Sequence, residues 1–206
     1  PIWRGPATPL GAASLALAWL VVAAWAAGWT VALWSPAGTT GISWHFFVDG
    51  SRALLHTDGL HTYAVTPTLQ IGPLALLVAG VFTALGESGL SAVQLAGMAA
   101  FGLVVWAIAD RAPAGARHTR VLTTGLVLAP PWAVLAVRWT HLDDVLALLL
   151  LGLTVRVVTG ERARPVLAGV LVAAAAAAKP WAIIGLALLL VTHDRRERTL
   201  GLAVAA

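Results

Sequence analysis

The sequence predicts an all-α protein, a polytopic transmembrane helix bundle, from its composition, its apolar runs and the placement of its charges. Its 206 residues are 59% hydrophobic and 11% charged, whereas a soluble domain carries about a quarter charged residues. So few charges exclude a soluble globular domain. The apolar runs are long and rich in Leu, Ala and Val, which favours helices over the alternating segments of about ten residues that build a membrane β-barrel.

The charges also indicate an orientation in the membrane. The net charge is +4, and most arginines stand in groups between apolar runs, as in the cytoplasmic loops of multi-pass plasma-membrane proteins. This placement gives no reason to expect nucleic acid as a partner. Many of the ten tryptophans stand at the ends of apolar runs, which is typical of interfacial anchors. The absence of cysteine excludes disulfides, thiolate metal sites and cysteine nucleophiles.

The first apolar run extends from Pro9 to Trp34 and is long enough to cross a bilayer. Arg4 precedes it, which places the N-terminus in the cytoplasm. Residues 35–67 form a polar first external loop, in which Trp44–Leu55 has apolar residues at near-helical spacing and predicts a helix on the membrane surface. The whole chain, residues 1–206, is expected to be one transmembrane module from a longer protein, because it starts without Met and ends in a new apolar run.

The next two apolar runs, Thr68–Leu85 and Leu90–Ala109, pose a problem of parity. If the first loop is external and the basic segment Arg111–Arg120 is cytoplasmic, an odd number of crossings must lie between them. We expect Thr68–Leu85 to be a re-entrant or outer-leaflet helix, because Gly72-Pro73 and its marginal length weaken it as a span. The alternative is that Arg111–Arg120 is external.

Two further apolar runs, Val121–Val137 and Val145–Val158, flank the external segment Arg138–Asp144. The last run, Val166–Thr192, has basic residues on both sides and is divided by Lys179-Pro180. Each half would be roughly 20 Å long as a helix, which is short for a core of about 30 Å. Residues 166–192 are therefore predicted to form a helical hairpin with Lys179 near its external tip. The alternative is one long helix kinked at proline.

In this topology the polar side chains that bear chemistry gather on the external face. The candidate catalytic residues are four carboxylates: Asp49, Asp58, Asp143 and Asp144. The candidate substrate-binding residues are histidines, a tyrosine and the external cations: His45, Arg52, His61, Tyr63, Arg138, His141 and Lys179. A carboxylate can act as a general base toward a sugar hydroxyl.

Each candidate also has a structural interpretation. Asp58 lies in a Thr-Asp-Gly sequence that suits a turn, and Asp49 fits the solvated face of the surface helix. Asp143 or Asp144 fits the cap of a helix that starts near Val145, or, with His141, a divalent cation site. Lys179 and Arg138 suit a phosphate group, although Lys179 also fits a lysine that extends to the interface.

Three stretches, taken in order, resemble GT-C membrane glycosyltransferases: Trp44–Leu77, the HLDDVLALLL sequence that starts at His141, and the alanine-rich run through Lys179-Pro180. The resemblance is nearest to actinobacterial mannosyltransferase-like proteins that use polyprenyl-phosphate sugars. It implies a GT-C-like N-terminal module and transfer of a sugar, with inversion, to a glycan or glycolipid acceptor on the outer membrane face. It also implies membrane lipid as a partner, no cofactor and no metal.

The resemblance further implies an acidic catalytic residue early in the first external loop. The corresponding stretch here is Ser43-Trp44-His45, and the first acid is Asp49. Asp49 is therefore expected to be the general base, with Asp143 or Asp144 orienting a substrate beside it. The competing functions are a transporter or flippase for a lipid-linked or anionic solute, and a non-catalytic membrane subunit. Charges at the midplane of a broken helix would favour the transporter.

Overall fold

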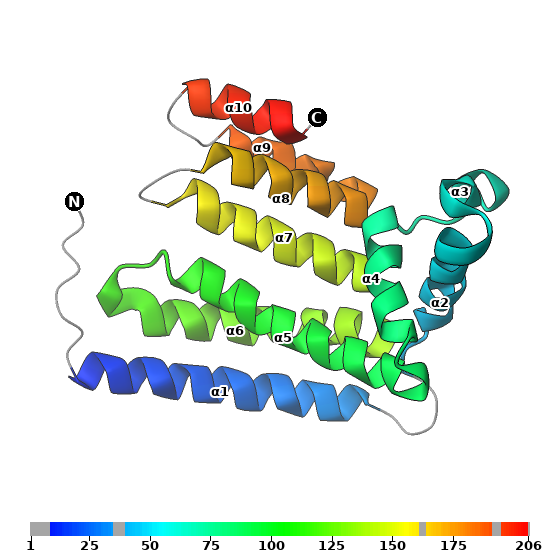
Figure 1. The fold of residues 1–206 in the computed structure, drawn as a ribbon. Helices are drawn as coiled ribbons and strands as arrows, with labels where there is room; N and C mark the ends of the chain where they lie inside the picture. The colour runs from blue at the N-terminus through cyan, green and yellow to red at the C-terminus, as the bar shows by residue number, and fades with distance from the viewer. Residues whose placement is uncertain (1–8, 35–39, 161–163, 191–194, 206) are drawn as a thin grey trace.

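The longest helices lie side by side, roughly parallel or antiparallel, in a computed structural model that describes residues 9–34, 40–160, 164–190 and 195–205 (Figure 1). Helix α1 packs on α6, α6 on α5, α5 on α7, α7 on α8, and α8 on α10. Over these described ranges the secondary structure is helical, with no strand. The bounds of these helices are α1 Pro9–Leu33, α5 Gly89–Ala109, α6 Arg117–Ala133, α7 Leu142–Val158, α8 Pro165–Ala178 and α10 Arg195–Ala205.

Three helical stretches among the described residues are long and apolar enough to cross a membrane: Gly11–Leu33, Gly86–Ala109 and Ala114–Trp139. Helix α1 packs one side against the bundle and exposes the other. It packs against α6 at Val22, where a Cβ on Gly125 would lie 2.5 Å from the valine methyl groups. Elsewhere Leu20 and Val31 are 66% and 73% exposed, as expected for a face that contacts lipid tails. The helical membrane-protein class predicted from composition therefore agrees with the structure.

Short helices form a separate group at one end of the bundle (Figure 1). The predicted surface helix is present as α2, Trp44–Arg52, and continues through a π turn at Ala53–Thr57 and a 3₁₀ turn at Gly59–His61 into α3, Thr62–Val65. Helix α4, Pro73–Thr83, then lies across the ends of the long helices. Its proline occupies the first helical position, where a missing N–H has no cost.

The length and position of helix α4 bear on the two arrangements expected for residues 68–85. It has 11 residues, about 16 Å of helix, which is too short for a hydrocarbon core of about 30 Å. A 3₁₀ turn, Gly86–Ser88, leads from it into α5 at the same end of the bundle. The polar segments around α2 and Arg138–Asp144 therefore share one end, and Arg111–Arg120 lies at the other, which favours the non-crossing arrangement.

Helix α8 ends at Ala178, and the chain then turns back. Lys179 has extended backbone, and a 3₁₀ segment, Pro180–Gly185, leads into α9, Leu186–Leu189. Ala182 packs beside Ala175, and Leu189 packs beside Ala168, which is the contact order of an antiparallel hairpin. The break stands at the predicted position, and the chain reverses there instead of continuing as one kinked helix.

A π-helical segment, Val134–Trp139, extends α6 and carries the chain toward α7. It follows Pro130 and Pro131, which remove two backbone donors from the last turns of α6. Such π segments are frequent where a helix is adjusted for function. Thr140 then adopts a left-handed conformation with φ of 52°, and the chain enters α7 at its polar first turn.

Candidate functional site

A polar cluster at the bundle end joins three segments that are distant in sequence. Three of its members, His141, Asp143 and Asp144, lie at the start of α7. Ser43 precedes α2, and Lys179 stands at the break after α8. Trp181, from the 3₁₀ segment that follows the break, completes the set. We call these six residues the polar cluster.

Asp143 and Lys179 form its central ion pair. Lys179 Nζ donates to Asp143 Oδ2 at 2.5 Å and lies 4.0 Å from Asp144 Oδ2. The Asp143 side chain is only 2% exposed, and its Oδ1 accepts the backbone N–H of Asp144 at 2.9 Å. Both oxygens of Asp143 are thus engaged within the protein, and one of them satisfies an N–H group in the first turn of α7.

Asp144 connects the cluster to the hairpin and to α2. Its Oδ1 accepts a hydrogen bond from Trp181 Nε1 at 2.8 Å. Its Oδ2 lies 3.0 Å from His141 Nδ1, and the other ring nitrogen, Nε2, lies 3.0 Å from Ser43 Oγ. Carboxylate, imidazole and hydroxyl therefore stand in a continuous hydrogen-bonded row.

Hydrogen bonds from the backbone of Ser43 and the side chain of Gln94 hold this row in place. Ser43 N–H donates to Trp139 O at 2.9 Å, which fixes the start of α2 against the segment before α7. Gln94 of α5, 1% exposed, donates to Val137 O at 2.8 Å and to Thr140 Oγ1 at 3.3 Å. A left-handed threonine is sterically unfavourable, so the bonds around Thr140 support the turn that presents His141.

Lys179 is positioned by close contact between α4 and α8. Gly72 N–H donates to Ala178 O at 3.0 Å. A Cβ at Gly72 would stand 2.2 Å from Ala177 O and 2.6 Å from Ala178 O, so only glycine permits this approach. The start of α4 therefore fixes the residue just before the lysine.

A cavity of about 370 Å³ opens beside the polar cluster. This volume lies within the range of roughly 300–1,000 Å³ that is usual for small-molecule sites. Its walls combine charged groups from α7 and the hairpin with aromatic side chains from α2 and polar groups from the loop before α4: Ser43, Phe46, Phe47, Thr66, Thr68, Leu69, Gln70, Ile71, His141, Asp143 and Lys179. The cavity thus has both an apolar and an ionic side.

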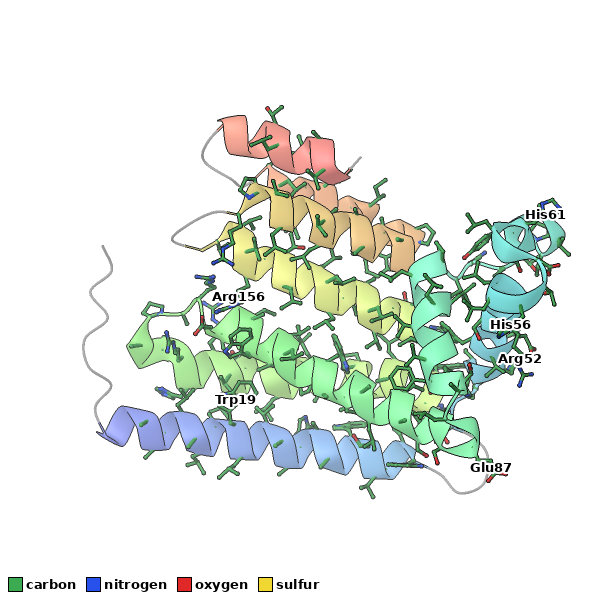
Figure 2. The ribbon with its side chains drawn as sticks, viewed as in Figure 1. Trp19, Arg52, His56, His61, Glu87 and Arg156 are labelled. Carbon is green, nitrogen blue, oxygen red and sulfur yellow. The ribbon has the colours of Figure 1, made fainter. Side chains whose placement is uncertain are left out.

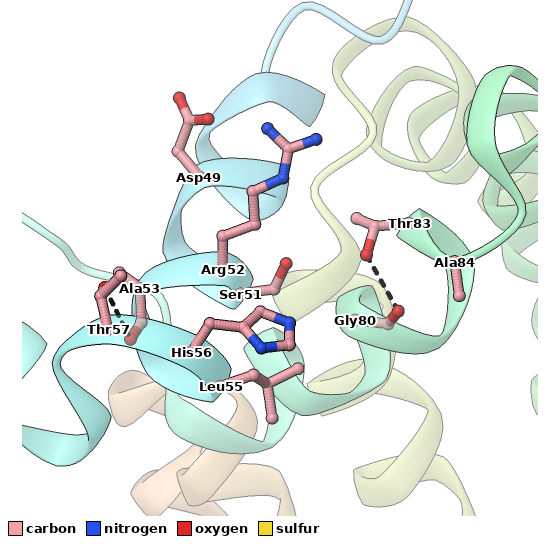
Figure 3. A pocket seen from close by; sticks show the side chains of 10 residues that line it. All are labelled: Asp49, Ser51, Arg52, Ala53, Leu55, His56, Thr57, Gly80, Thr83 and Ala84. Carbon is pink, nitrogen blue, oxygen red and sulfur yellow. Dashed lines mark hydrogen bonds between the residues drawn. The ribbon is translucent and has the colours of Figure 1, made fainter.

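Asp49 does not belong to this cavity. It is exposed on the outer side of α2 and lines a second cavity of about 670 Å³ with Arg52 and His56, against the end of α4 (Figure 3). The two cavities share none of their described lining residues. Asp49 was expected to stand beside Asp143 or Asp144, and the structure does not bring them together. Asp49 stands two residues after Phe47, about 200° around α2, so it points away from the side of the helix that buries Phe47.

The remaining predicted site residues lie around the surface helices. His45 is exposed, with Nδ1 3.1 Å from Ile42 O. His61 is exposed, and Asp58 uses its backbone N–H to close the turn on Ala53 O at 2.8 Å. Tyr63 donates to Ile71 O at 2.9 Å, and burial raises the pKa of its hydroxyl. Arg138 is exposed, and its backbone oxygen accepts the N–H of Ile42, before α2, at 3.2 Å. None of these residues is a member of the polar cluster.

The structure also bears on the metal site considered for the HLDD sequence. Ligand atoms of His141, Asp143 and Asp144 lie within 4.8 Å of one another. The Lys179 ammonium, however, already donates to Asp143 and balances part of this negative charge. The lysine explains the paired carboxylates as an internal ion pair.

Sequence reasoning missed three contributors to the cluster. Ser43 was noted only as the place where an acid is absent, Trp181 only as an interfacial tryptophan, and Gln94 not at all. No local pattern marks them, because each meets its partner through packing across at least 37 residues of sequence.

A second charged network lies at the opposite end of the bundle. Arg156 of α7 donates to Asp110 and places its guanidinium 3.9 Å from the centre of the Trp106 ring. Arg117 lies 3.7 Å from the other oxygen of Asp110. The Arg156 hydrogen bond and the positive charges around it lower the pKa of the Asp110 carboxyl. This network matches the basic end predicted to be cytoplasmic, although Arg4 and Arg162 lie outside the described residues, as do the side chains of Arg195–Arg198.

Comparison with known proteins adds no further constraint: no family model, curated protein or solved structure matches the chain.

Proposed function

We propose that the protein is an integral membrane glycosyltransferase of the GT-C type, which transfers a sugar, mannose in the branch it resembles, from a polyprenyl-phosphate donor. The acceptor is a glycan or glycolipid on the outer face of the plasma membrane. The observation that supports this proposal is the cavity beside the polar cluster. It combines a lysine, a carboxylate and a histidine with aromatic side chains, at the end of an apolar helix bundle.

The two sides of the cavity suit the two parts of such a donor. Lys179 lines the cavity and is 20% exposed. Its ammonium has three donors, of which Asp143 takes one, so the others can reach a phosphate oxygen. Phe46 of α2 also lines the cavity and is 55% exposed, so its aromatic face can pack on a sugar ring or on the first isoprene units.

The assignment of Lys179 to the phosphate differs in one respect from the sequence-based expectation. There the lysine was an isolated cation that required an anionic ligand. In the structure Asp143 already neutralises it, so a phosphate is an additional partner of an ion pair. The expected contribution is directional hydrogen bonding to the leaving group as its charge develops, and the cost of keeping a lysine in the bundle is met by Asp143.

The chemistry requires only groups of these kinds. The acceptor oxygen attacks the anomeric carbon, the bond from that carbon to the phosphate oxygen breaks, and polyprenyl phosphate leaves with the electron pair. The acceptor loses its proton to a base in the cavity. Because a phosphate leaving group is already a stable anion, hydrogen bonding from Lys179 is sufficient and no separate acid is needed.

The test is sugar transfer in vesicles that contain the purified protein, with radiolabelled polyprenyl-phosphate mannose and a glycolipid acceptor. The wild-type protein should form labelled product, and Lys179→Met should raise the KM for the donor about tenfold or more, as expected for loss of a charged hydrogen bond of roughly 1.5–3 kcal/mol. Arg120→Met, at the opposite end, is the matched control. Absence of labelled product with wild-type protein would reject the proposal.

A transporter is the second candidate, and the break at Lys179 is the observation that favours it. Discontinuous helices with a charged residue at the break are common at transport sites. Such sites lie near the bilayer midplane, whereas Lys179 and the start of α7 lie at one end of the bundle (Figure 1). Exchange of a labelled lipid-linked or anionic solute across sealed vesicles, without product formation, would select the transporter.

A further inference from the structure

Ser43, His141 and Asp144 form a row whose order has chemical meaning. The hydroxyl and the carboxylate each lie 3.0 Å from a different nitrogen of the same imidazole ring. A base that contacts a hydroxyl on one side and is oriented by a carboxylate on the other is the general arrangement for abstracting a proton. The cluster therefore contains more than the Asp143–Lys179 ion pair.

The partners determine which nitrogen carries the proton in the neutral ring. An ionised carboxylate can only accept, so Nδ1 must donate to Asp144. Nε2 is then unprotonated and accepts from the Ser43 hydroxyl. This is the tautomer with a free basic nitrogen directed at a hydroxyl group. Trp181 holds the other oxygen of Asp144, which keeps the carboxylate in place.

Ser43 is not occupied by its usual structural role. It stands at the N-cap position of α2, where a serine side chain commonly accepts a backbone N–H of the first turn. Here its side chain makes no such capping bond and meets His141 instead. Ser43 and His141 both line the cavity that also contains Lys179, so a ligand in this cavity can reach the row.

We infer that His141 is the general base of this site, that Asp144 is the positioning residue that sets its tautomer, and that the Ser43 hydroxyl relays the proton. The inference deepens the proposed glycosyl transfer and rests on it. As the acceptor oxygen bonds to the anomeric carbon, its proton passes to Ser43 Oγ while the Ser43 proton passes to His141 Nε2. The products are the new glycoside, free polyprenyl phosphate and an imidazolium paired with Asp144.

The other carboxylates fit this role less well. Asp143 is 2% exposed, and its oxygens are bound to Lys179 and to the Asp144 N–H, so accepting a proton would break the ion pair. Asp49 faces the second cavity, on the outer side of α2 (Figure 3). Among the described residues that line the cavity, only His141 offers a nitrogen able to accept a proton.

Turnover in the vesicle assay gives the first test. His141→Gln should lower kcat by about 10²–10⁴-fold, the usual contribution of a general base, and should leave the donor KM within about twofold of its wild-type value. Asp144→Asn should lower kcat similarly, because an amide that donates to Nδ1 forces the proton onto Nε2. Ser43→Ala should lower kcat, and Ser43→Thr, which keeps the hydroxyl, should recover most of it.

Matched substitutions at the opposite end of the bundle serve as controls. His118→Gln and Ser14→Ala replace the same residue types outside the cluster and should leave kcat unchanged. If wild-type protein transfers sugar and His141→Gln retains most of its kcat, the base assignment fails while the proposed function stands. If wild-type protein forms no product, the proposed function fails.

The tautomer can be tested without turnover. Nitrogen-15 NMR of histidine-labelled protein in nanodiscs, with His141→Gln to assign the signal, should show a neutral His141 protonated on Nδ1 in the wild type and on Nε2 in Asp144→Asn. A wild-type ring protonated on Nε2 would overturn the inference. Covalent labelling of Ser43 by a fluorophosphonate would overturn it as well, because Ser43 would then be a nucleophile and not a relay.

Discussion

At the scale of single residues, the site depends on one lysine and its partner. Lys179 is the only lysine in the sequence, and its charge has no counterpart within its own apolar run. From the sequence alone, Lys179 is therefore predicted to bind an external phosphate. The partner, Asp143, lies 36 residues away on another helix, and only packing between α7 and α8 brings the two together.

The ion pair predicts that Asp143 and Lys179 are energetically coupled, which a double-mutant cycle on the free energy of unfolding can measure. Lys179→Met leaves a carboxylate that is 2% exposed without a counter-charge, and loss of one partner of such a pair costs about 3–5 kcal/mol. Asp143→Asn should also destabilise the protein. The double variant should lose clearly less free energy of unfolding than the two single variants lose together. Denaturant unfolding in detergent measures all three.

The control for this cycle is Asp49 and Arg52, which are both exposed on α2. Asp49→Asn and Arg52→Met should change stability little, and the coupling between these i,i+3 neighbours should not exceed about 0.5 kcal/mol. Additive losses for Asp143 and Lys179 would contradict the role given to the ion pair.

A second residue-scale prediction concerns Asp110 and acid. The Arg156 hydrogen bond lowers the pKa of this carboxyl below its ordinary value of 3.8. A lowered pKa in the folded state contributes stability that is complete above 3.8 and is lost as the pH falls through the lowered value. Thermal unfolding in detergent should therefore show an acid-dependent loss that is smaller in Asp110→Asn. The exposed Asp58→Asn is the control, and an equal slope in Asp110→Asn and wild type would contradict the assignment.

At the scale of elements, the sequence predicted where helices form better than it predicted which helices pack against one another. The apolar runs anticipated α1, α5, α6 and α7 closely, because their length and hydropathy are local properties. The break in the last run was also predictable from Pro180, whose ring does not fit within a helix. The contact between α4 and α8 was not predictable, because Gly72 was interpreted only as a weak point in a span. Its function in the structure is to permit a close approach of two backbones.

This contact predicts a large effect from one methyl group. Gly72→Ala would place a Cβ 2.2 Å from Ala177 O, so one of two backbones must move. Overpacking of this kind costs about 1–3 kcal/mol, and a shift of the α8 end also displaces Lys179. We expect a lower midpoint of thermal unfolding and weaker donor binding in the vesicle assay.

Gly102→Ala in α5 is the matched control for this substitution. A Cβ there meets nothing within 4 Å, and alanine is favoured over glycine inside a helix by about 0.5–1 kcal/mol. Gly102→Ala should therefore keep or raise stability. If Gly72→Ala behaves like Gly102→Ala, the close approach of α4 and α8 does not position the lysine.

At the scale of the whole molecule, charge separates the two ends of the bundle. Arg156 lies at one end, while Arg52, His56, His61 and Glu87 lie at the other (Figure 2). The arginine-rich end carries the Asp110 network, and the other end carries both cavities. The positive-inside rule places the arginine-rich end in the cytoplasm. The end with the two cavities is then external, provided that α4 does not cross the bilayer.

The topology can therefore be tested at three positions, since the chain has no native cysteine. We expect Thr40→Cys and Ser88→Cys to react with a membrane-impermeant maleimide from outside the cell, and Gly115→Cys to react only after permeabilisation. Ser88 is decisive, because it lies between α4 and α5. If α4 crossed the bilayer, Ser88→Cys would be protected and Gly115→Cys would react from outside. Labelling in denaturing detergent shows that each thiol is reactive, so protection of Ser88→Cys in intact cells would contradict both the outer-leaflet position of α4 and the external placement of the cavity.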